Sequence, residues 1–421
     1  MFGLNKFGDG ICFGRITRFF REFGIDQAAL AKRSVAVTGS NGKGSTARFI
    51  AAALKAEGHS VGLFTSPHLF HVRERFVLDD FAIEEADFER HAATVLGFAK
   101  RLADNDKMGA FEFLFLIAIL WFEEKKPGAI VWEAGIGGRY DPIRTVRSRT
   151  LALTSIELEH TQLLGATEEL IACDKIDALT PGGTLIVSPS VPADLREAIE
   201  GYCRLGDKRP LFVADDLAVA DIQNAANGTT FKAAGKAHAL RLIGGHQIDN
   251  ALTACHAARD WLGGREDALT LLPSLRNTSW RGRLERVAEN PDLWIDVGHT
   301  PGAIDRVTSA FLDFRSRDKT LVVFGVSASK DVAGIARLVA DRFDHFILTG
   351  ANKAGADVAI FRDAFPGQDV LVEYDIAAAA RRARERAAKV GLTVLAIGGL
   401  FLAVEFEHAW RGGDPKELDF L

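Results

Sequence analysis

A glycine-rich segment near the start of the chain has the residue types that bind phosphate groups. It follows a β-branched apolar run and reads Thr38-Gly39-Ser40-Asn41-Gly42-Lys43-Gly44-Ser45-Thr46. Glycines let backbone N–H groups approach phosphate oxygens, and the start of a following helix adds positive potential. Lys43 supplies charge for the terminal phosphates, and a hydroxyl from Ser45 or Thr46 suits Mg²⁺. We therefore expect Lys43 to act in catalysis. We expect the nucleotide to be bound by Gly39, Asn41, Gly42, Lys43, Gly44, Ser45 and Thr46.

The spacing of this segment is a variant of the G-x-x-x-x-G-K-[ST] pattern. Gly39 stands only three residues before Gly42, and Gly44 separates Lys43 from the hydroxyl residues. A glycine-rich turn with a surface lysine is the alternative. The apolar run before the segment and the helical periodicity after it favour the phosphate loop.

Glu133 is the second residue with metal chemistry. It ends the apolar run 129–133 and precedes a turn that contains Gly135, Gly137 and Gly138. A carboxylate at the end of a parallel strand can reach a Mg²⁺ ion that Ser45 also holds. An exposed acid in a turn is the alternative.

These residues need a scaffold of alternating strands and helices. Strands are predicted at 35–38, 61–64, 129–133, 151–156 and 185–188, and helices at 46–56 and 249–261. A second pattern has strands at 293–297, 321–325, 345–349 and 394–398, after a turn-rich stretch at 286–292. We expect an α/β fold with a P-loop-type, mostly parallel sheet in an ATP-binding domain, residues 1–288. A smaller Rossmann-like α/β domain would follow, residues 289–421.

Composition narrows the classes of partner. The net charge of −5 is too small to favour a polyanion, so nucleic acid is not expected. The apolar run 113–122 is about half the length that crosses a bilayer, which predicts a buried helix rather than a membrane span. The first residues carry Lys6, Asp9 and Arg15 and lack the apolar core of a signal peptide. The four cysteines form no metal or disulfide pattern, so a cytoplasmic protein is expected.

Six further segments carry reactive side chains, and all but the first of them also contain glycine. They are Ser66-Pro67-His68-Leu69 with Glu74-Arg75, residues 133–141, residues 154–165, Gly245-His246-Gln247 with Asn250-Ala251, residues 280–285 and residues 296–301. Together with 40–46, they resemble in order the motifs of the folylpolyglutamate synthase and dihydrofolate synthase family, a branch of the Mur-type amide ligases. The resemblance covers residues 35–301 and is weaker beyond them.

The resemblance implies an ATP-dependent, ADP-forming ligase that makes an acyl phosphate on a pterin-type carboxylate and joins it to L-glutamate. Residues 1–288 would be the Mur-ligase-like ATP-binding domain and 289–421 the C-terminal ligase domain, in a monomer. Two Mg²⁺ ions are implied, with Ser45, Glu133, His160 and a carbamylated Lys175 as metal ligands. Asn250, Arg283 and Asp296 would hold the nucleotide, and His299 and Lys175 would act in catalysis. Substrate would bind at Ser66, Pro67, His68 and Arg75.

Alternatives accompany these assignments. Lys175 stands among Glu168, Glu169 and Asp174, which also fits a lysine on a helix surface. The activity could be that of a family ligase for another carboxylate or amine, or of a nucleotide-binding paralogue without ligase activity. Some positions depart from the family motifs: 142–144, 157–159, 176–177 and Thr300. We expect these to line the cleft where acceptor and amine meet, where they would alter selectivity, although neutral drift is the alternative.

Overall fold

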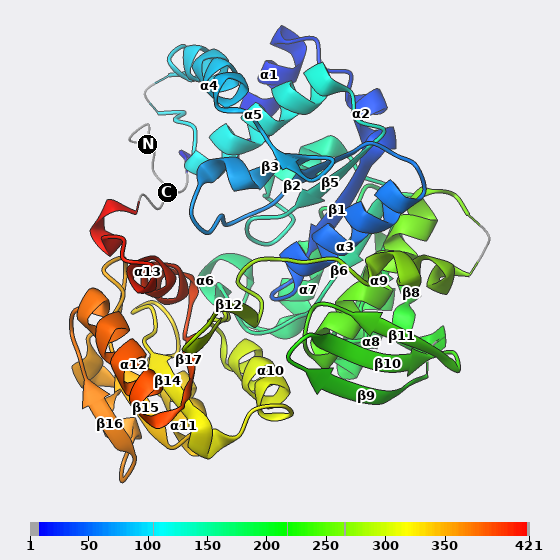
Figure 1. Ribbon diagram of the computed structural model, residues 1–421. Helices are drawn as coiled ribbons and strands as arrows, with labels where there is room; N and C mark the ends of the chain where they lie inside the picture. The colour runs from blue at the N-terminus through cyan, green and yellow to red at the C-terminus, as the bar shows by residue number, and fades with distance from the viewer. Residues whose placement is uncertain (1–7, 104, 217, 265–266, 419–421) are drawn as a thin grey trace.

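The computed structural model describes residues 8–103, 105–216, 218–264 and 267–418 (Figure 1). Lys6, one of the charged residues of the N-terminal segment, lies outside these residues. The described chain forms two α/β parts and a small antiparallel sheet beside the first part. None of the helices in the described ranges is both long enough and apolar enough to span a bilayer.

A mostly parallel sheet forms the centre of the N-terminal part. Eight strands belong to it within the described residues, and only β3 and β4 of these run antiparallel to their neighbours. In order across the sheet the strands are β4 (Phe81–Ala82), β3 (Phe76–Leu78), β2 (Val61–Phe64), β5 (Ala129–Glu133), β1 (Ser34–Thr38), β6 (Thr150–Leu153), β7 (Thr184–Val187) and β8 (Arg209–Phe212). Because β1 lies between β5 and β6, the loops after these three strands meet at one edge of the sheet.

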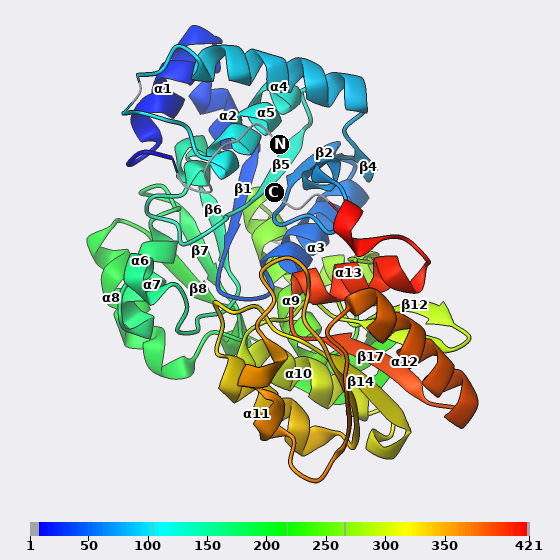
Figure 2. The same cartoon turned by 90° about the vertical axis from the view of Figure 1, so that its left-hand side faces the viewer.

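Helices cover both faces of this sheet (Figure 2). Alternation along β1 sends Ala36 to one face, and Val35 and Val37 to the other. The helices of the Ala36 face are α1 (Phe13–Glu22), α2 (Gln27–Arg33), α4 (Glu85–Ala99), α5 (Ala110–Lys125), α7 (Glu168–Ile176) and α8 (Arg196–Leu205). The Val35 face is covered by α3 (Lys43–Ala56) and α9 (Gly245–Trp261). The short α6 (Thr161–Leu164) follows β6.

A small antiparallel sheet packs beside α9. Its described strands are β9 (Val219–Ala225), β10 (Gly228–Ala233) and β11 (Lys236–Leu240), with β10 in the middle. Phe231, Ala233 and Leu240 join the core that α3 and α9 share with the large sheet. This sheet was not predicted from the sequence.

The C-terminal part is a second α/β unit. Within the described residues its sheet has six strands, in the order β12 (Glu285–Glu289), β13 (Asp292–Ile295), β17 (Thr393–Ile397), β14 (Thr320–Phe324), β15 (His345–Leu348) and β16 (Asp369–Val372). All are parallel except β12, which pairs antiparallel with β13. Its helices are α10 (Pro301–Leu312) and α11 (Val332–Arg342) on one face and α12 (Ile376–Val390) and α13 (Leu400–Trp410) on the other.

Short 3-10 helices connect these elements. They are η1 (Val72–Arg75), η2 (Pro142–Val146), η3 (Ala193–Leu195), η4 (Val213–Asp216), η5 (Ala268–Leu275), η6 (Arg317–Lys319), η7 (Val358–Ile360), η8 (Arg362–Ala364) and η9 (Pro415–Glu417).

The division between the two parts depends on β12. The sequence-based boundary between residues 288 and 289 falls inside this strand, whose residues bond to β13 from Glu285 onward. We therefore propose that the C-terminal domain begins before Glu285. The cluster of turn residues at 289–292 is the hairpin between β12 and β13.

The predicted strands and helices are present, with shifted ends. The run 151–156 is a strand only to Leu153, because Thr154 and Ser155 turn their hydroxyls to the phosphate loop: Thr154 Oγ1 donates to Asn41 O at 2.5 Å, and Ser155 Oγ accepts from Asn41 N at 2.8 Å. The apolar run 113–122 is the buried centre of α5, which confirms the buried helix.

Candidate active site

The C-terminal edges of the two parallel sheets face a shared cavity of about 490 Å³. From the N-terminal domain its lining includes the loop after β1, Glu133 at the end of β5 and the segment after β6. From the C-terminal domain it includes Asp296, after β13, and His299, before α10. Ligand sites in open α/β sheets lie outside the carboxyl ends of the strands, so this is the expected place for a site.

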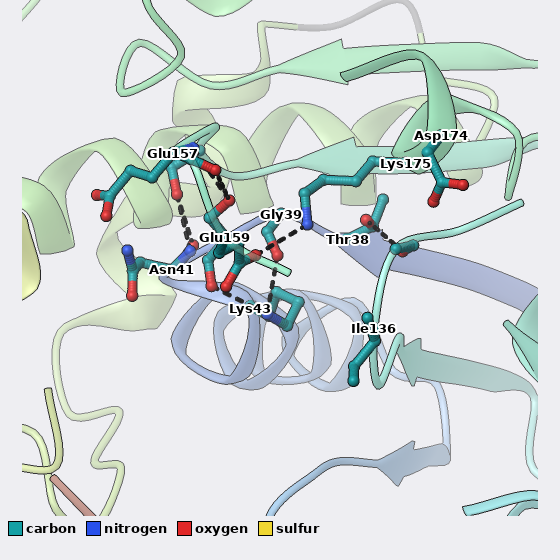
Figure 3. A network of polar contacts seen from close by, with 12 residues as sticks. Thr38, Gly39, Asn41, Lys43, Ile136, Glu157, Glu159, Asp174 and Lys175 are labelled. Carbon is teal, nitrogen blue, oxygen red and sulfur yellow. Dashed lines mark hydrogen bonds and ion pairs between the residues drawn. The ribbon is translucent and has the colours of Figure 1, made fainter. Parts of the chain in front are cut away.

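The phosphate loop runs from β1 into α3. Gly42 is the N-terminal cap of α3 with φ +81°, and a Cβ atom there would lie 2.5 Å from Asn250 Oδ1. Glycine meets both demands, since it tolerates positive φ and needs no such space. Lys43 curls back so that its Nζ donates to Gly39 O at 2.8 Å and Ser40 O at 3.0 Å (Figure 3). The start of α3 and the Lys43 ammonium together make this end of the cavity positive.

The two hydroxyl candidates of the loop have different environments. Thr46 is fully buried and its Oγ1 donates to Asn250 Oδ1 at 3.2 Å, so it braces α3 against α9. Ser45 lines the cavity, and its buried Oγ has no hydrogen-bond partner among the described residues. A buried hydroxyl without a partner is unfavourable, so Ser45 is suited to a ligand that enters the cavity.

Glu133 is a buried carboxylate at the end of β5. One oxygen accepts a hydrogen bond from Ser66 N at 2.9 Å. Burial raises the pKa of Glu133 to about 7, although the charges of Lys43, Arg283 and Arg75 oppose the rise. A carboxylate with this cost of ionisation gains most from a cation beside it.

Lys175 lies inside the protein rather than on a helix surface. Its side chain is 1% exposed, and its Nζ donates to Glu159 Oε1 at 3.1 Å (Figure 3). Burial lowers the pKa of Lys175 to about 8, and the charge of Lys43 adds to this effect while Glu159 opposes it. Asp174 anchors the helix, since its Oδ1 accepts from Gly138 N at 2.9 Å. The structure therefore places Lys175 at the cavity, against the surface alternative.

His160 lines the same cavity and stands at the start of α6 with φ +46°. Glu159 and Lys175 line the cavity with it. Within the described part of the chain, however, no three His, Cys, Asp or Glu side chains are grouped as a metal site. The ligand set implied for a second ion is therefore incomplete while Lys175 remains an amine.

The Ser66-Pro67-His68 segment forms another wall of the cavity. Glu74 holds it by accepting from Leu69 N at 2.8 Å and from Phe70 N at 3.0 Å. Arg75 lies behind His68 and donates from Nε to His68 Nδ1 at 2.8 Å. Burial lowers the pKa of Arg75 to about 10, with the charges of Glu133 and Glu74 opposing.

The C-terminal wall carries Arg283, Asp296 and His299. Asp296 is buried and accepts hydrogen bonds from Leu284 N at 2.8 Å and Gly298 N at 2.6 Å. It therefore fixes the backbone next to Arg283 and the backbone next to His299. Burial raises its pKa, and the charge of Arg283 opposes the rise. Burial lowers the pKa of His299 to about 4, helped by the charges of Lys330 and Lys43, so the imidazole is neutral near pH 7.

Comparison with known proteins identifies the family. Residues 282–400 match the model of the Mur ligase, glutamate ligase domain. A folylpolyglutamate synthase of Lacticaseibacillus casei is 30% identical over 314 residues, which are 72% of this chain and 73% of the relative. This chain belongs to the folylpolyglutamate synthase/dihydrofolate synthase family.

Two further matches extend the family comparison. A probable bifunctional folylpolyglutamate synthase/dihydropteroate synthase of Halobacterium salinarum is 33% identical over 386 residues, 89% of this chain and 47% of the relative. The chain thus spans about half the length of such relatives. The fold matches that of Mycobacterium tuberculosis folylpolyglutamate synthase, solved with ADP and AMPPCP, with TM-score 0.84, 23% identity and coverage of 96% of both chains.

Most residues assigned from the family motifs line the cavity. They are Asn41, Gly42, Lys43, Gly44, Ser45, Ser66, Pro67, His68, Glu133, His160, Lys175, Asn250, Arg283, Asp296 and His299. Three assigned residues do not line it. Gly39 packs tightly against Thr154, Thr46 bonds to Asn250, and Arg75 supports His68 from behind. These three support the site rather than face a ligand in it.

The positions that depart from the family motifs correct one expectation. Only Glu159 among them lines the cavity. Pro142 and Ile143 are buried in the core, and Asp177 pairs with Arg139 at 2.7 Å and Lys208 at 3.1 Å. Two more of these positions, Glu157 and Thr300, contact each other instead.

Sequence reasoning missed several residues of the site. Trp280 places its indole against Gly44, where a Cβ atom would lie 2.9 Å from Nε1. Lys330 is close enough to His299 to lower its pKa. Trp280 belongs to the family motif at 280–285, so the sequence could have pointed to it. Lys330 lies in a loop of the C-terminal domain that only the fold brings close to His299.

Proposed function

We propose that this chain is an ATP-dependent carboxylate–amine ligase that forms ADP and adds L-glutamate to a folate-type acid, as a dihydrofolate synthase or folylpolyglutamate synthase. Family membership supports the reaction class. The observation that carries the proposal is the shared cavity, into which the phosphate loop of one domain and Asp296 and His299 of the other both project. A site closed between two domains protects an acyl phosphate from water.

The Ser45 and Glu133 side chains fit a Mg²⁺ ion. Ser45 offers a buried hydroxyl oxygen that has no partner in the described chain, and Glu133 offers a buried carboxylate. Both are hard oxygen donors of the kind that Mg²⁺ takes together with phosphate oxygens and water. When bound, the ion neutralises charge on the β- and γ-phosphates.

A second Mg²⁺ ion would be held by His160 and a carbamylated Lys175. With a pKa of about 8, part of the Lys175 population carries a neutral amine at neutral pH. That amine can attack CO₂ to form an N-carboxylate, with release of one proton. The product carries oxygen donors where the free lysine has only N–H groups, which completes a ligand set that the unmodified residues lack.

The chain's residues then have distinct tasks. The acceptor carboxylate attacks the γ-phosphorus of ATP and the bond to the ADP oxygen breaks, while Lys43 neutralises charge on the transferring group. The amine of glutamate attacks the acyl carbon and inorganic phosphate leaves, with loss of a proton from nitrogen. With a pKa of about 4, His299 is too weak a base for that proton, so we assign it to contact with the nucleotide.

The test is ADP release measured with dihydropteroate, tetrahydrofolate and unrelated carboxylic acids, each with ATP and with or without glutamate. Glutamate-dependent ADP release with a pterin acid supports the proposal. Turnover with other acids or amines alone identifies a family ligase of different specificity, and binding of ATP without any ADP release identifies a paralogue without ligase activity.

We further propose that the protein acts as a monomer in the cytoplasm. Both walls of the cavity come from one chain. All four cysteines are free thiols, which suits a reducing compartment.

A further inference from the structure

Glu157 joins the two domains at the phosphate loop. Its carboxylate crosses from the segment after β6 to the start of α10, where Oε1 accepts from Arg306 Nη2 at 2.6 Å and Oε2 accepts from Thr300 Oγ1 at 2.9 Å. Its backbone is fixed on the other side, since Glu157 N donates to Ser40 Oγ at 3.0 Å. One residue thus contacts both the phosphate loop and the C-terminal domain.

Thr300 completes the connection. Its hydroxyl donates to Glu157 and accepts from Asn41 Nδ2 and from Ala303 N, each at 3.2 Å. One donor and two acceptor sites are the full capacity of a hydroxyl group. Asn41 belongs to the phosphate loop and lies beside Glu157 (Figure 3). Thr300 is 143 positions from Glu157 and 259 positions from Asn41 in the chain. The three side chains therefore form one polar network across the cleft between the domains.

We propose that Glu157 is a positioning residue that fastens the C-terminal domain to the phosphate loop and so holds bound nucleotide in the cleft. That a nucleotide occupies the cleft rests on the proposed function. That Glu157 holds the two domains together rests only on its contacts. Nucleotide leaves when the contacts of Glu157 to Thr300 and Arg306 break, and α10 then moves away together with His299, which precedes it.

The two partners are matched to each other in this chain. Glu157 and Thr300 both stand where the residues depart from the family motifs, so the network does not follow from those motifs. Gly302 leaves room for it, because a Cβ atom there would lie 2.7 Å from Glu157 Oε1. The ion pair is partly exposed, with Glu157 22% and Arg306 34% exposed, so dissolved salt weakens it.

The experiment combines two readouts on the full chain. Stopped-flow fluorescence measures dissociation of a fluorescent ATP analogue, and small-angle scattering of the nucleotide-free protein measures the separation of the domains. The substitution Glu157→Ala removes one ion pair and one hydrogen bond between the domains. We therefore expect the ATP analogue to dissociate about tenfold faster and the nucleotide-free protein to have a larger radius of gyration. Glu157→Gln should be intermediate, since it keeps an acceptor for Thr300 but loses the charge.

Gly302→Ala provides an independent variant that leaves Glu157 in place. The added methyl group displaces the carboxylate of Glu157, so dissociation of the ATP analogue should accelerate as in Glu157→Ala. Combining Gly302→Ala with Glu157→Ala should add little to the effect of either substitution alone. Raising ionic strength should accelerate dissociation in the wild type and much less in Glu157→Gln. Glu197→Ala, at an exposed glutamate on α8 outside the cavity, is the matched control.

The outcomes separate this proposal from the proposed function. Wild-type-like scattering and dissociation in folded Glu157→Ala and Gly302→Ala would overturn the positioning role. A chain that binds no ATP analogue but opens in both variants would support that role and contradict the ligase assignment.

Discussion

Two lysines in one cavity carry different parts of the proposed chemistry. Lys43 lies at the start of α3 with its ammonium bonded to two loop carbonyls, where incoming phosphate oxygens can replace them. Lys175 is buried and has its pKa lowered by that burial. Lys43 is therefore placed to bind phosphate oxygens, and Lys175 is suited to lose its proton.

Lys43→Ala should reduce ligation at least about 10³-fold, because the charge acts on the transferring phosphoryl group. The fold should survive, with a change in unfolding free energy within about 0.5 kcal/mol, since the side chain is only partly buried and bonds to loop carbonyls. Initial rates of ADP release and thermal unfolding measure the two effects. Lys32→Ala, at an exposed lysine of α2, is the control, and near wild-type ligation by folded Lys43→Ala would remove the phosphate-loop assignment.

Lys175→Ala should lose most of its activity, and bicarbonate or a short carboxylate such as formate should partly restore it by replacing the carbamate. Wild-type protein in ¹³C-bicarbonate should show a carbamate signal that this variant lacks. Lys208→Ala is the matched control, because Lys208 is a buried lysine that bonds to Asp177 outside the cavity. Full activity of Lys175→Ala without added carboxylate would contradict the role.

At the scale of single residues, the sequence identified the chemistry but not always the environment. Acidic neighbours of Lys175 suggested a solvated helix face, yet Lys175 lines the cavity while Glu169 on the same helix is exposed. Spacing alone could not distinguish Ser45 from Thr46, since only packing against α9 reveals which hydroxyl is occupied.

Among the elements, the start of α3 is the most demanding piece of backbone in the site. Gly42 combines positive φ with a close approach to Asn250, and Asn250 in turn accepts from Thr46. The geometry of the phosphate loop therefore depends on α9 as well as on β1.

Gly42→Ala should lower the unfolding free energy by about 1–2 kcal/mol, through strain at positive φ and displacement of Asn250, and should weaken nucleotide binding. Gly97→Ala is the matched control. Gly97 lies inside α4 with open space around it, so the same change there should stabilise the protein by about 0.5–1 kcal/mol. Urea unfolding and titration with an ATP analogue check both; equal effects of the two substitutions would refute the loop argument.

The elements show where periodicity fails as a guide. Strands of the two parallel sheets are buried on both faces and appear as continuous apolar runs, so they were predictable. The sheet β9–β11 was not, because β9 is mostly exposed and its polar residues follow no apolar alternation. β12 was read as a linker for the same reason.

The interface between the two domains contains two partly buried histidines. His246 accepts from Gln247 Nε2 at 3.1 Å, and burial lowers its pKa to about 3, with the charges of Arg306 and Arg283 adding to the effect. His299 has a pKa of about 4 for the reasons given above. Both are neutral in the folded protein.

Acid should therefore unfold this protein through these two residues. A histidine in the unfolded chain takes up a proton near pH 6.5, whereas in the folded protein His299 does so near pH 4 and His246 near pH 3. Their contribution to the free energy of unfolding is therefore complete above pH 6.5 and is lost as the pH falls below it. Urea midpoints between pH 4 and pH 7.5 should fall less steeply in His246→Gln/His299→Asn than in the wild type. His59→Gln, outside the cavity, is the control; identical slopes in all three proteins would rule the mechanism out.

Contacts between the domains were the least predictable part. Glu157 and Thr300 appeared in the sequence only as unusual residues in two separate motifs, and they were expected to face substrate. The closure of the two sheets on each other turns them into partners across the cleft. Pairing over such a separation leaves no local pattern in one sequence.

Trp280 gives the protein an optical reporter of its own phosphate loop. Its half-buried indole lies against Gly44, while four of the other five tryptophans, Trp121, Trp132, Trp294 and Trp410, are buried in the cores. Indole emission responds to nearby charge and to solvent. Arrival of a polyphosphate at the loop therefore changes the intrinsic fluorescence at this residue, and nucleotide occupancy becomes visible without any attached dye.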